Sequence, residues 1–163
     1  MKKYLCMLTA CLVAAIFNTT SAQEVSVASA EPEFTHGRAL NNISIRAIRD
    51  FHKLYRDVFD EDWYSVSNGY IAKFTRNDIR TRVDYDKKGN WLSTIRFMNE
   101  RQVPRDVRNR VKSVYFDDII KQVEEITNKE DKVYLFHLEG ENTWKIVRVS
   151  EVEMTVLEDF NKK

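Results

Sequence analysis

The chain has 163 residues, with 26 Lys and Arg against 25 Asp and Glu, and it contains two cysteines. This length is enough for one compact domain. The nearly balanced charge argues against a general nucleic-acid-binding protein, because such proteins carry a marked basic excess. Both cysteines, Cys6 and Cys11, lie in the N-terminal apolar segment. The rest of the chain therefore has no thiol for a disulfide or a thiolate metal site.

Residues 1–22 have the pattern of a secretory signal peptide. Lys2 and Lys3 form a basic start, residues 4–17 are mainly apolar, and small residues lead up to Ala22. This pattern predicts export and cleavage between Ala22 and Gln23. A membrane anchor is disfavoured, since the apolar run is shorter than the roughly 20 residues that a spanning helix needs.

A second processing route is open at Cys11. Residues 8–11 (Leu-Thr-Ala-Cys) resemble a bacterial lipobox, which would attach a lipid to Cys11. The apolar run continues past Cys11 to Phe17, and this favours ordinary cleavage. We therefore expect a periplasmic or secreted protein, with lipid anchoring through Cys11 as the less favoured alternative. Residues 23–38 are small and polar and predict a flexible tether.

The pattern becomes helical over about residues 41–59. Ile48, Phe51, Tyr55 and Phe59 recur at steps of three and four. This spacing predicts an amphipathic helix with an aromatic stripe. We expect the stripe to pack on the aromatic face of the sheet that follows.

Residues 62–98 predict four antiparallel strands joined by three tight turns. Asn68-Gly69 is the strongest hairpin signal, because both residues accept positive φ angles. Asn77-Asp78 suits a second two-residue turn, and residues 86–89 suit a type I turn closed by Gly89 in a bulge. These turns predict a register that pairs Trp63 with Phe74, Ala72 with Val83, and Tyr85 with Trp91.

Period-two alternation sorts these side chains onto two faces. The predicted core face carries Trp63, Tyr70, Ala72, Phe74, Ile79, Val83, Tyr85, Trp91, Ile95 and Phe97. The other face is largely solvated, and the register places Lys73 opposite Arg82 and Arg80 opposite Arg96. Like charges opposite one another destabilise a sheet, so a basic partner-binding platform is one interpretation and an ordinary solvated face is the other. The candidate partner-binding residues are Tyr64, Lys73, Arg80, Arg82 and Arg96.

The second half repeats the order of helix and strands. Pro104 is placed to begin a short helix, and strands are predicted over residues 119–126, 132–138, 143–149 and 152–157. The spacing of Tyr85, Gly89 and Trp91 is echoed weakly by Tyr134, Gly140 and Trp144. We therefore predict an α+β fold, with helices packed on one face of a curved antiparallel sheet and two degenerate helix-plus-strands repeats. The repeats would span about 41–100 and 101–160 within one domain, residues 39–163.

No motif predicts catalysis, a cofactor or a metal. Residues 84–90 begin like a calcium loop, but the fifth and twelfth positions of an EF-hand would be Lys88 and Ile95, which cannot serve as ligands. The three histidines are isolated from one another, and the chain lacks a phosphate-binding loop and a nucleophile elbow. We expect no enzyme activity, no catalytic residues, no cofactor and no metal.

Three segments carry a resemblance to a known family. Residues 69–74, 83–94 and 103–107 follow one another behind a signal peptide. Together they resemble the PepSY-like family, the β-lactamase-inhibitor-like proteins of Bacteroidetes envelopes, over about Asn41 to Asp159. The resemblance implies tandem units of helices on a curved antiparallel sheet, export, and no catalysis or cofactor. It transfers no β-lactamase contact to a residue of this chain.

Two functions follow as hypotheses. The leading one is an exported, non-catalytic binding module that presents an open sheet face to a protein or peptide with an acidic surface, and that could act as an inhibitor. The alternative is a periplasmic small-ligand carrier with a cavity between helices and sheet. We expect no nucleic-acid partner and no transmembrane segment in the processed chain.

Overall fold

The structure, a computed structural model, describes residues 40–162. All described residues belong to one compact unit. The predicted signal peptide and tether lie outside the described residues. Within residues 40–162, no helix is long and apolar enough to cross a membrane.

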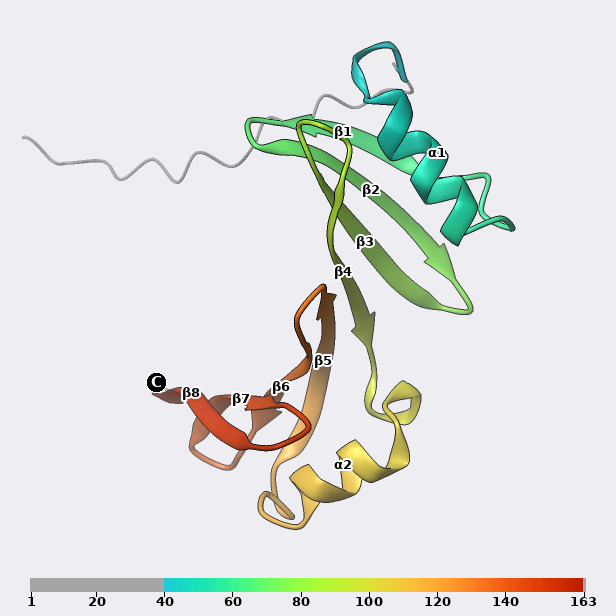
Figure 1. Cartoon of the computed structure of the whole chain (residues 1–163). Coiled ribbons are helices and arrows are strands. Elements are labelled where there is room, and N and C mark those ends of the chain that lie inside the picture. Colours follow the sequence, from blue (N-terminus) through green and yellow to red (C-terminus); the bar gives the residue numbers. More distant parts are fainter. Residues whose placement is uncertain (1–39, 163) are drawn as a thin grey trace, which may run out of the picture. The chain divides into compact units, whose positions relative to one another are not determined.

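Eight strands form one antiparallel sheet in which each strand pairs with its neighbours in chain order (Figure 1). The first four strands follow η1 (Leu40–Asn42) and α1 (Ile45–Leu54), and are β1 (Asp62–Val66), β2 (Gly69–Arg76), β3 (Ile79–Asp86) and β4 (Trp91–Met98). The last four follow η2 (Glu100–Gln102) and α2 (Arg105–Lys112), and are β5 (Ile119–Asn128), β6 (Lys132–Glu139), β7 (Thr143–Val149) and β8 (Met154–Asn161).

The predicted α+β fold with two helix-plus-strands repeats is wrong. The α-helices have only ten and eight residues, whereas the strands hold most of the regular structure and join in one sheet. The sequence echo does not correspond to equivalent positions either. Tyr85 pairs with Trp91 across the β3–β4 turn. Tyr134 pairs with Val149 and not with Trp144.

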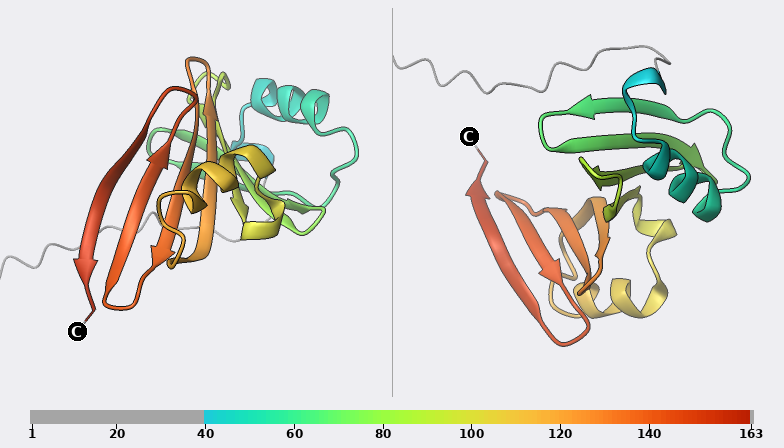
Figure 2. Two further views of the ribbon diagram at one scale, coloured as in Figure 1. Left: turned by 90° about the horizontal axis from the view of Figure 1, so that it is seen from below. Right: turned by 45° about the horizontal axis from the view of Figure 1, so that its top comes forward.

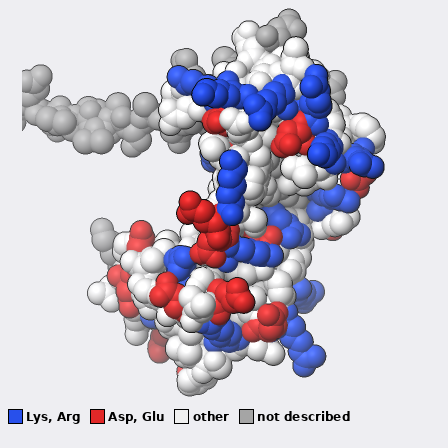
Figure 3. Space-filling model, in the orientation of Figure 1, with Lys and Arg blue, Asp and Glu red and all other residues white. Residues whose placement is uncertain are grey.

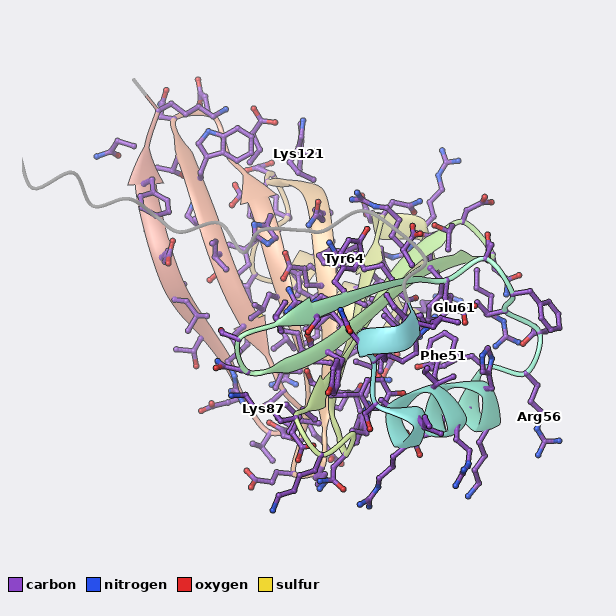
Figure 4. The ribbon with its side chains drawn as sticks, turned by 90° about the horizontal axis from the view of Figure 1, so that it is seen from above. Phe51, Arg56, Glu61, Tyr64, Lys87 and Lys121 are labelled. Carbon is purple, nitrogen blue, oxygen red and sulfur yellow. The ribbon has the colours of Figure 1, made fainter. Side chains whose placement is uncertain are left out.

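α1 packs on the first strands through an aromatic cluster. Phe51 is fully buried, and its ring centroid lies 5.4 Å from those of Trp63 and Phe74 in edge-to-face contacts, an arrangement that aromatic quadrupoles favour. Figure 4 shows Phe51 between α1 and the sheet. The helix ends at Leu54, so Phe59 lies beyond it and is 80% exposed. The helical spacing of the apolar residues thus continues past the real helix.

A second core lies under α2, and both cores lie on the same face of the sheet. Val111 of α2 packs with Met98, Val123, Phe136, Leu138 and Val147. Thr94 pairs with Val83 of the first core, and Met98 pairs with Val123 of the second. Positions four apart on one strand point to one face. We call this the helix face and the opposite one the outer face; Figure 2 shows each helix beside the strands it covers.

Two of the three predicted turns are confirmed. Asn77 and Asp78 have φ angles of 52° and 59°, and Ala72 pairs with Val83 as predicted. Gly89 has φ of 76°, and its N–H donates to the Asp86 carbonyl oxygen at 2.9 Å.

The first turn differs from the prediction. Ser67 and Asn68 form it, Val66 pairs with Gly69, and Trp63 pairs with Ala72 instead of Phe74. A Cβ atom on Gly69 would lie 1.9 Å from the Tyr85 carbonyl oxygen. Gly69 therefore allows the backbone of β3 to approach closely. The two turn residues are Ser67 and Asn68, one residue earlier in the chain than the predicted Asn68 and Gly69. The pairing of β1 with β2 is shifted by two residues, an even number, so each side chain of these two strands still lies on its predicted face.

A β-bulge in β4 overturns the predicted faces of that strand. Tyr85 pairs with Trp91 but Asp84 pairs with Ser93, so Leu92 is the extra residue. One inserted residue exchanges the two faces for every side chain that follows. Ile95 and Phe97, predicted in the core, lie on the outer face. Arg96 lies on the helix face, opposite Thr81 and not Arg80.

Candidate functional site

The outer face of β4–β7 carries a row of apolar side chains that neither described helix covers. Ile95 pairs with Ile126, which pairs with Val133 on the next strand. All members of the row are partly buried and none is enclosed like the core residues. Contiguous exposed apolar surface of this kind marks interaction sites in soluble proteins. We call this row the apolar strip: Ile95, Phe97, Ile126, Val133, Leu135 and Ile146.

Three cations border the apolar strip on β2 and β3. Lys73 pairs with Arg82, as predicted, and Arg80 pairs with Phe97. The Arg80 guanidinium carbon lies 5.5 Å from the centroid of the Phe97 ring, which places the cation against the π face. The basic cluster, Lys73, Arg80 and Arg82, is therefore continuous with the apolar strip.

Neighbouring groups hold two members of the basic cluster in place. Arg82 donates to Asp84 Oδ1 from Nε at 2.9 Å and from Nη2 at 2.7 Å. Ser93 donates to the other Asp84 oxygen at 3.2 Å. The Lys73 ammonium lies 4.8 Å from the ring centroid of Tyr64, and Figure 4 shows Tyr64 on the side of the sheet away from α1. The cluster is thus more ordered than the solvated side chains that the sequence suggested.

Ile71 shows that this part of the outer face is not fully exposed to solvent. It lies between Tyr64 of β1 and Asp84 of β3 and is 4% exposed. Ile71 is therefore a core-like position within the predicted solvated face. The long side chains around it cover apolar surface while their charged ends reach water, as such stems commonly do.

A cavity of about 490 Å³ opens between the basic cluster and the apolar strip. This volume is in the range of ordinary ligand pockets. Its lining combines three cations, two aromatic residues and two carboxylates, so it can accept a carboxylate next to an apolar group. The lining includes Asp60, Asp62, Lys73, Arg80, Arg82, Phe97 and Gln122.

Arg96 belongs to a different group of charges, on the helix face. It donates to Glu125 Oε1 at 3.0 Å, and Lys132 lies 3.0 Å from the other Glu125 oxygen. Glu125 is 5% exposed. Burial alone would raise the pKa of Glu125, but hydrogen bonds from Lys132, Arg96 and Tyr134 outweigh it and leave this pKa below its ordinary value. Arg96 therefore stabilises a buried carboxylate on the helix face and does not border the outer-face cations.

Sequence reasoning missed the β5–β7 part of the outer face. Glu124 pairs with Phe97, lies 3.3 Å from His137 Nε2 and accepts from Gln122 at 3.2 Å. Glu124 and Glu125 are adjacent, so alternation places one on each face without saying which one is buried. Only the register with β4, set by the Leu92 bulge, decides this. The signal that was available is the unbroken apolar run from Val133 to Phe136 in β6, which places apolar side chains on both faces, with Val133 and Leu135 on the outer one.

Comparisons with known proteins identify the fold. No family model and no curated protein matches the chain. A DUF2874 family protein from Bacteroides ovatus is similar in structure with TM-score 0.61 and 17% identity, covering 73% of this chain and 87% of that protein. A proposed periplasmic protein from Bacteroides eggerthii has TM-score 0.59, 18% identity and coverages of 73% and 88%. A BLIP-like protein from Bacteroides fragilis has TM-score 0.59, 20% identity and coverages of 72% and 86%. The chain shares the fold of these proteins.

Proposed function

We propose that this chain is an exported, non-catalytic binding module whose outer face docks a protein or peptide partner. The partner places apolar side chains on the apolar strip and an acidic group at the basic cluster. Tyr64 borders the docking surface beside Lys73. The partner can be an enzyme that the module inhibits, and inhibition would then follow from covering the enzyme's surface.

The observation that carries this proposal is the continuity of two unlike surfaces. Six partly exposed apolar side chains on four neighbouring strands adjoin three cations through the Arg80–Phe97 contact. Protein interfaces combine an apolar centre with a polar rim in this way. Lys73 and Arg82 face one another across the strands, an arrangement of like charges that by itself destabilises a sheet.

The comparisons support the same proposal without identifying the partner. One solved protein with this fold is described as BLIP-like and another as a proposed periplasmic protein. The basic start and apolar run of residues 1–22 support export to the same compartment. PepSY-like membership of this chain remains part of the proposal.

The test is partner capture by the processed chain, residues 23–163, from envelope extract. Arg80→Gln with Arg82→Gln removes two cations, and Phe97→Ala with Leu135→Ala truncates the apolar strip. We expect both double variants to lose the same partner that the wild type captures. The loss for the charge variant should be largest at low salt and shrink as salt rises, because exposed charges act mainly through a screened association rate.

The matched control is Arg105→Gln with Arg108→Gln on α2, which changes the net charge equally on the helix face. This control should capture the partner like the wild type, and the melting temperatures of all variants should show that they fold. The proposal would be wrong if both outer-face variants still captured the partner. It would also be wrong if the control variant lost capture to the same extent as they do. A purified β-lactamase panel tests inhibition separately.

A cavity beside α2 favours a small-ligand carrier as the second candidate. It measures about 620 Å³ and lies between α2, the β5–β6 turn and the β7–β8 turn, with Val107, Arg110, Lys132 and Tyr134 in its lining. Arg110 closes one side by donating to the Ser150 carbonyl oxygen at 2.7 Å. A thermal-shift screen of small polar ligands tests it, since a bound ligand stabilises the folded chain by mass action. A rise in melting temperature caused by a small ligand, with no protein partner present, would favour the carrier.

A further inference from the structure

The exposed side of α1 gathers cations around a shallow depression. Ala47 and Phe51 face the core and are fully buried, so Arg46, Arg49 and Lys53 lie on the opposite, exposed side of the helix. These three line a depression of about 350 Å³, together with Lys129 from the β5–β6 turn. Asp50 is the one carboxylate among the described residues that line it.

These cations have no ion-pair partners within residues 40–162. In β5–β8, by contrast, Lys121, Lys145 and Arg148 each lie within 3.3 Å of a carboxylate oxygen. Like charges three and four residues apart on a helix repel one another. Asp50, four residues after Arg46 and three before Lys53, offsets part of this repulsion. Three cations against one carboxylate still leave this side of α1 with a net positive charge.

The β3–β4 turn extends the same surface. A Cβ atom on Gly89 would lie 2.5 Å from Ser44 Oγ and 2.8 Å from the Ala47 nitrogen, so this turn sits against the start of α1. It brings Lys87 and Lys88, both exposed, next to the helix; Figure 4 labels Lys87 at this turn. Figure 3 shows Lys and Arg side chains in a band over this part of the molecule. We call this surface the basic face: Arg46, Arg49, Lys53, Lys87, Lys88 and Lys129.

Two further observations indicate what the basic face binds. Ile45 and Leu54, at the two ends of α1, are 72% and 53% exposed. The charge is also uneven: residues 40–98 carry 11 Lys and Arg against 8 Asp and Glu, while residues 99–162 carry 11 against 14. A charge difference of this kind orients a molecule toward an anionic surface. Cations on the exposed side of a helix, with exposed apolar residues at its two ends, favour binding to an anionic membrane surface.

We propose that the basic face docks the protein on an anionic lipid bilayer, with α1 lying along the membrane surface. The lipid phosphate groups bind the cations, and the side chains of Ile45 and Leu54 reach the boundary between headgroups and acyl chains. α1 follows η1, the first element of the described chain, so the basic face is built from the start of residues 40–162. Because the basic face is on the helix face, docking leaves the outer face in water for a partner. The inference stands independently of the proposed function.

The test is sedimentation of the processed chain, residues 23–163, with vesicles of phosphatidylcholine alone or mixed with phosphatidylglycerol. We expect binding to the mixed vesicles at low salt and release at high salt. The triple variant Arg46→Gln, Arg49→Gln and Lys53→Gln should bind on the order of 100-fold more weakly, at roughly fivefold for each cation removed. The control triple variant Arg101→Gln, Arg105→Gln and Arg108→Gln has the same net charge and should bind like the wild type.

Equal binding to both kinds of vesicle, or no binding to either, would overturn the inference. Equal loss in the two triple variants would do so as well, because it would show an effect of net charge alone. A third measurement adds inorganic phosphate to the wild type and to the α1 triple variant and records their melting temperatures. If phosphate raises the melting temperature of the wild type but not of the α1 variant, and vesicles are not bound, the site takes a free anion and no membrane.

Discussion

Gly89 controls two features at the scale of one residue, the β3–β4 turn and the seating of α1. Its φ of 76° lies in the left-handed region, which a β-branched residue resists. A side chain there would also meet the Ala47 backbone nitrogen at 2.8 Å. Turn geometry and helix packing therefore require the same glycine.

Gly89→Val should destabilise the fold by about 2–4 kcal/mol, since it combines backbone strain with a clash against helix backbone. Gly89→Asn separates the two effects, because Asn tolerates positive φ but still meets α1. Urea unfolding of both variants, with the exposed Lys88→Ala as control, measures the difference. A Val variant as stable as the control would show that α1 can move away freely.

Phe51 and Phe59 test where the aromatic stripe ends. Phe51→Ala should cost about 3–5 kcal/mol, as deletion of a fully buried aromatic side chain does. Phe59→Ala should change stability by less than about 0.5 kcal/mol, because the side chain is 80% exposed. Similar losses in the two variants by thermal and urea unfolding would contradict the helix end at Leu54.

At the scale of the element, β5 sends two adjacent carboxylates to opposite faces. Glu124 joins the outer face beside His137, while Glu125 is buried with Arg96 and Lys132. A buried carboxylate of this kind needs its partners, because removing them leaves a desolvated charge. The pairing of β4 with β5 thus depends on a charge network inside the helix face.

Glu125→Gln should make this dependence visible as a function of pH. The folded pKa of Glu125 is lowered from its ordinary value of 4.5. A lowered carboxyl pKa contributes stability that is complete above the unfolded value and is lost as pH falls through the folded one. The variant should therefore lose about 1–3 kcal/mol near neutral pH and little in acid.

Urea unfolding at a series of acidic pH values measures the free energy of unfolding of the wild type and of Glu125→Gln. The control is Glu124→Gln, which makes the same change on the outer face. A stability difference between wild type and Glu125→Gln that stays constant with pH would show that the carboxylate charge does not matter.

At the scale of the whole molecule, the two faces of one sheet carry different surfaces. The helix face holds both cores and, on α1, the basic face; the outer face holds the apolar strip and the basic cluster. A membrane and a partner could thus be bound at the same time. This arrangement presupposes export, which the N-terminal residues predict.

N-terminal sequencing of protein recovered from the envelope should begin at Gln23. Intact mass measurement checks the same point, since a lipid on Cys11 would add acyl chains and retain residues 11–22. Recovery of lipid-modified Cys11 would overturn ordinary cleavage and would give membrane attachment a covalent cause.

Local patterns were sufficient for much of the secondary structure. The Asn77-Asp78 turn, the Gly89 turn and the strand starting at Thr143 follow from backbone preferences and short-range alternation, which neighbouring residues fix. Lys73 faces Arg82 because the turn between them fixes their pairing. The neighbourhood of Lys73 and Arg82 in the candidate site was therefore predicted from the sequence.

The rest was decided by tertiary structure. The bulge at Leu92 exchanged the faces of Phe97 and Arg96, and alternation is equally satisfied before and after such an exchange. Which of Glu124 and Glu125 is buried depends on pairing with β4, a contact between residues far apart in the chain. The end of α1 at Leu54 and the joining of all strands in one sheet likewise depend on packing. Residue preferences act over a few positions, whereas strand register is a property of the assembled sheet.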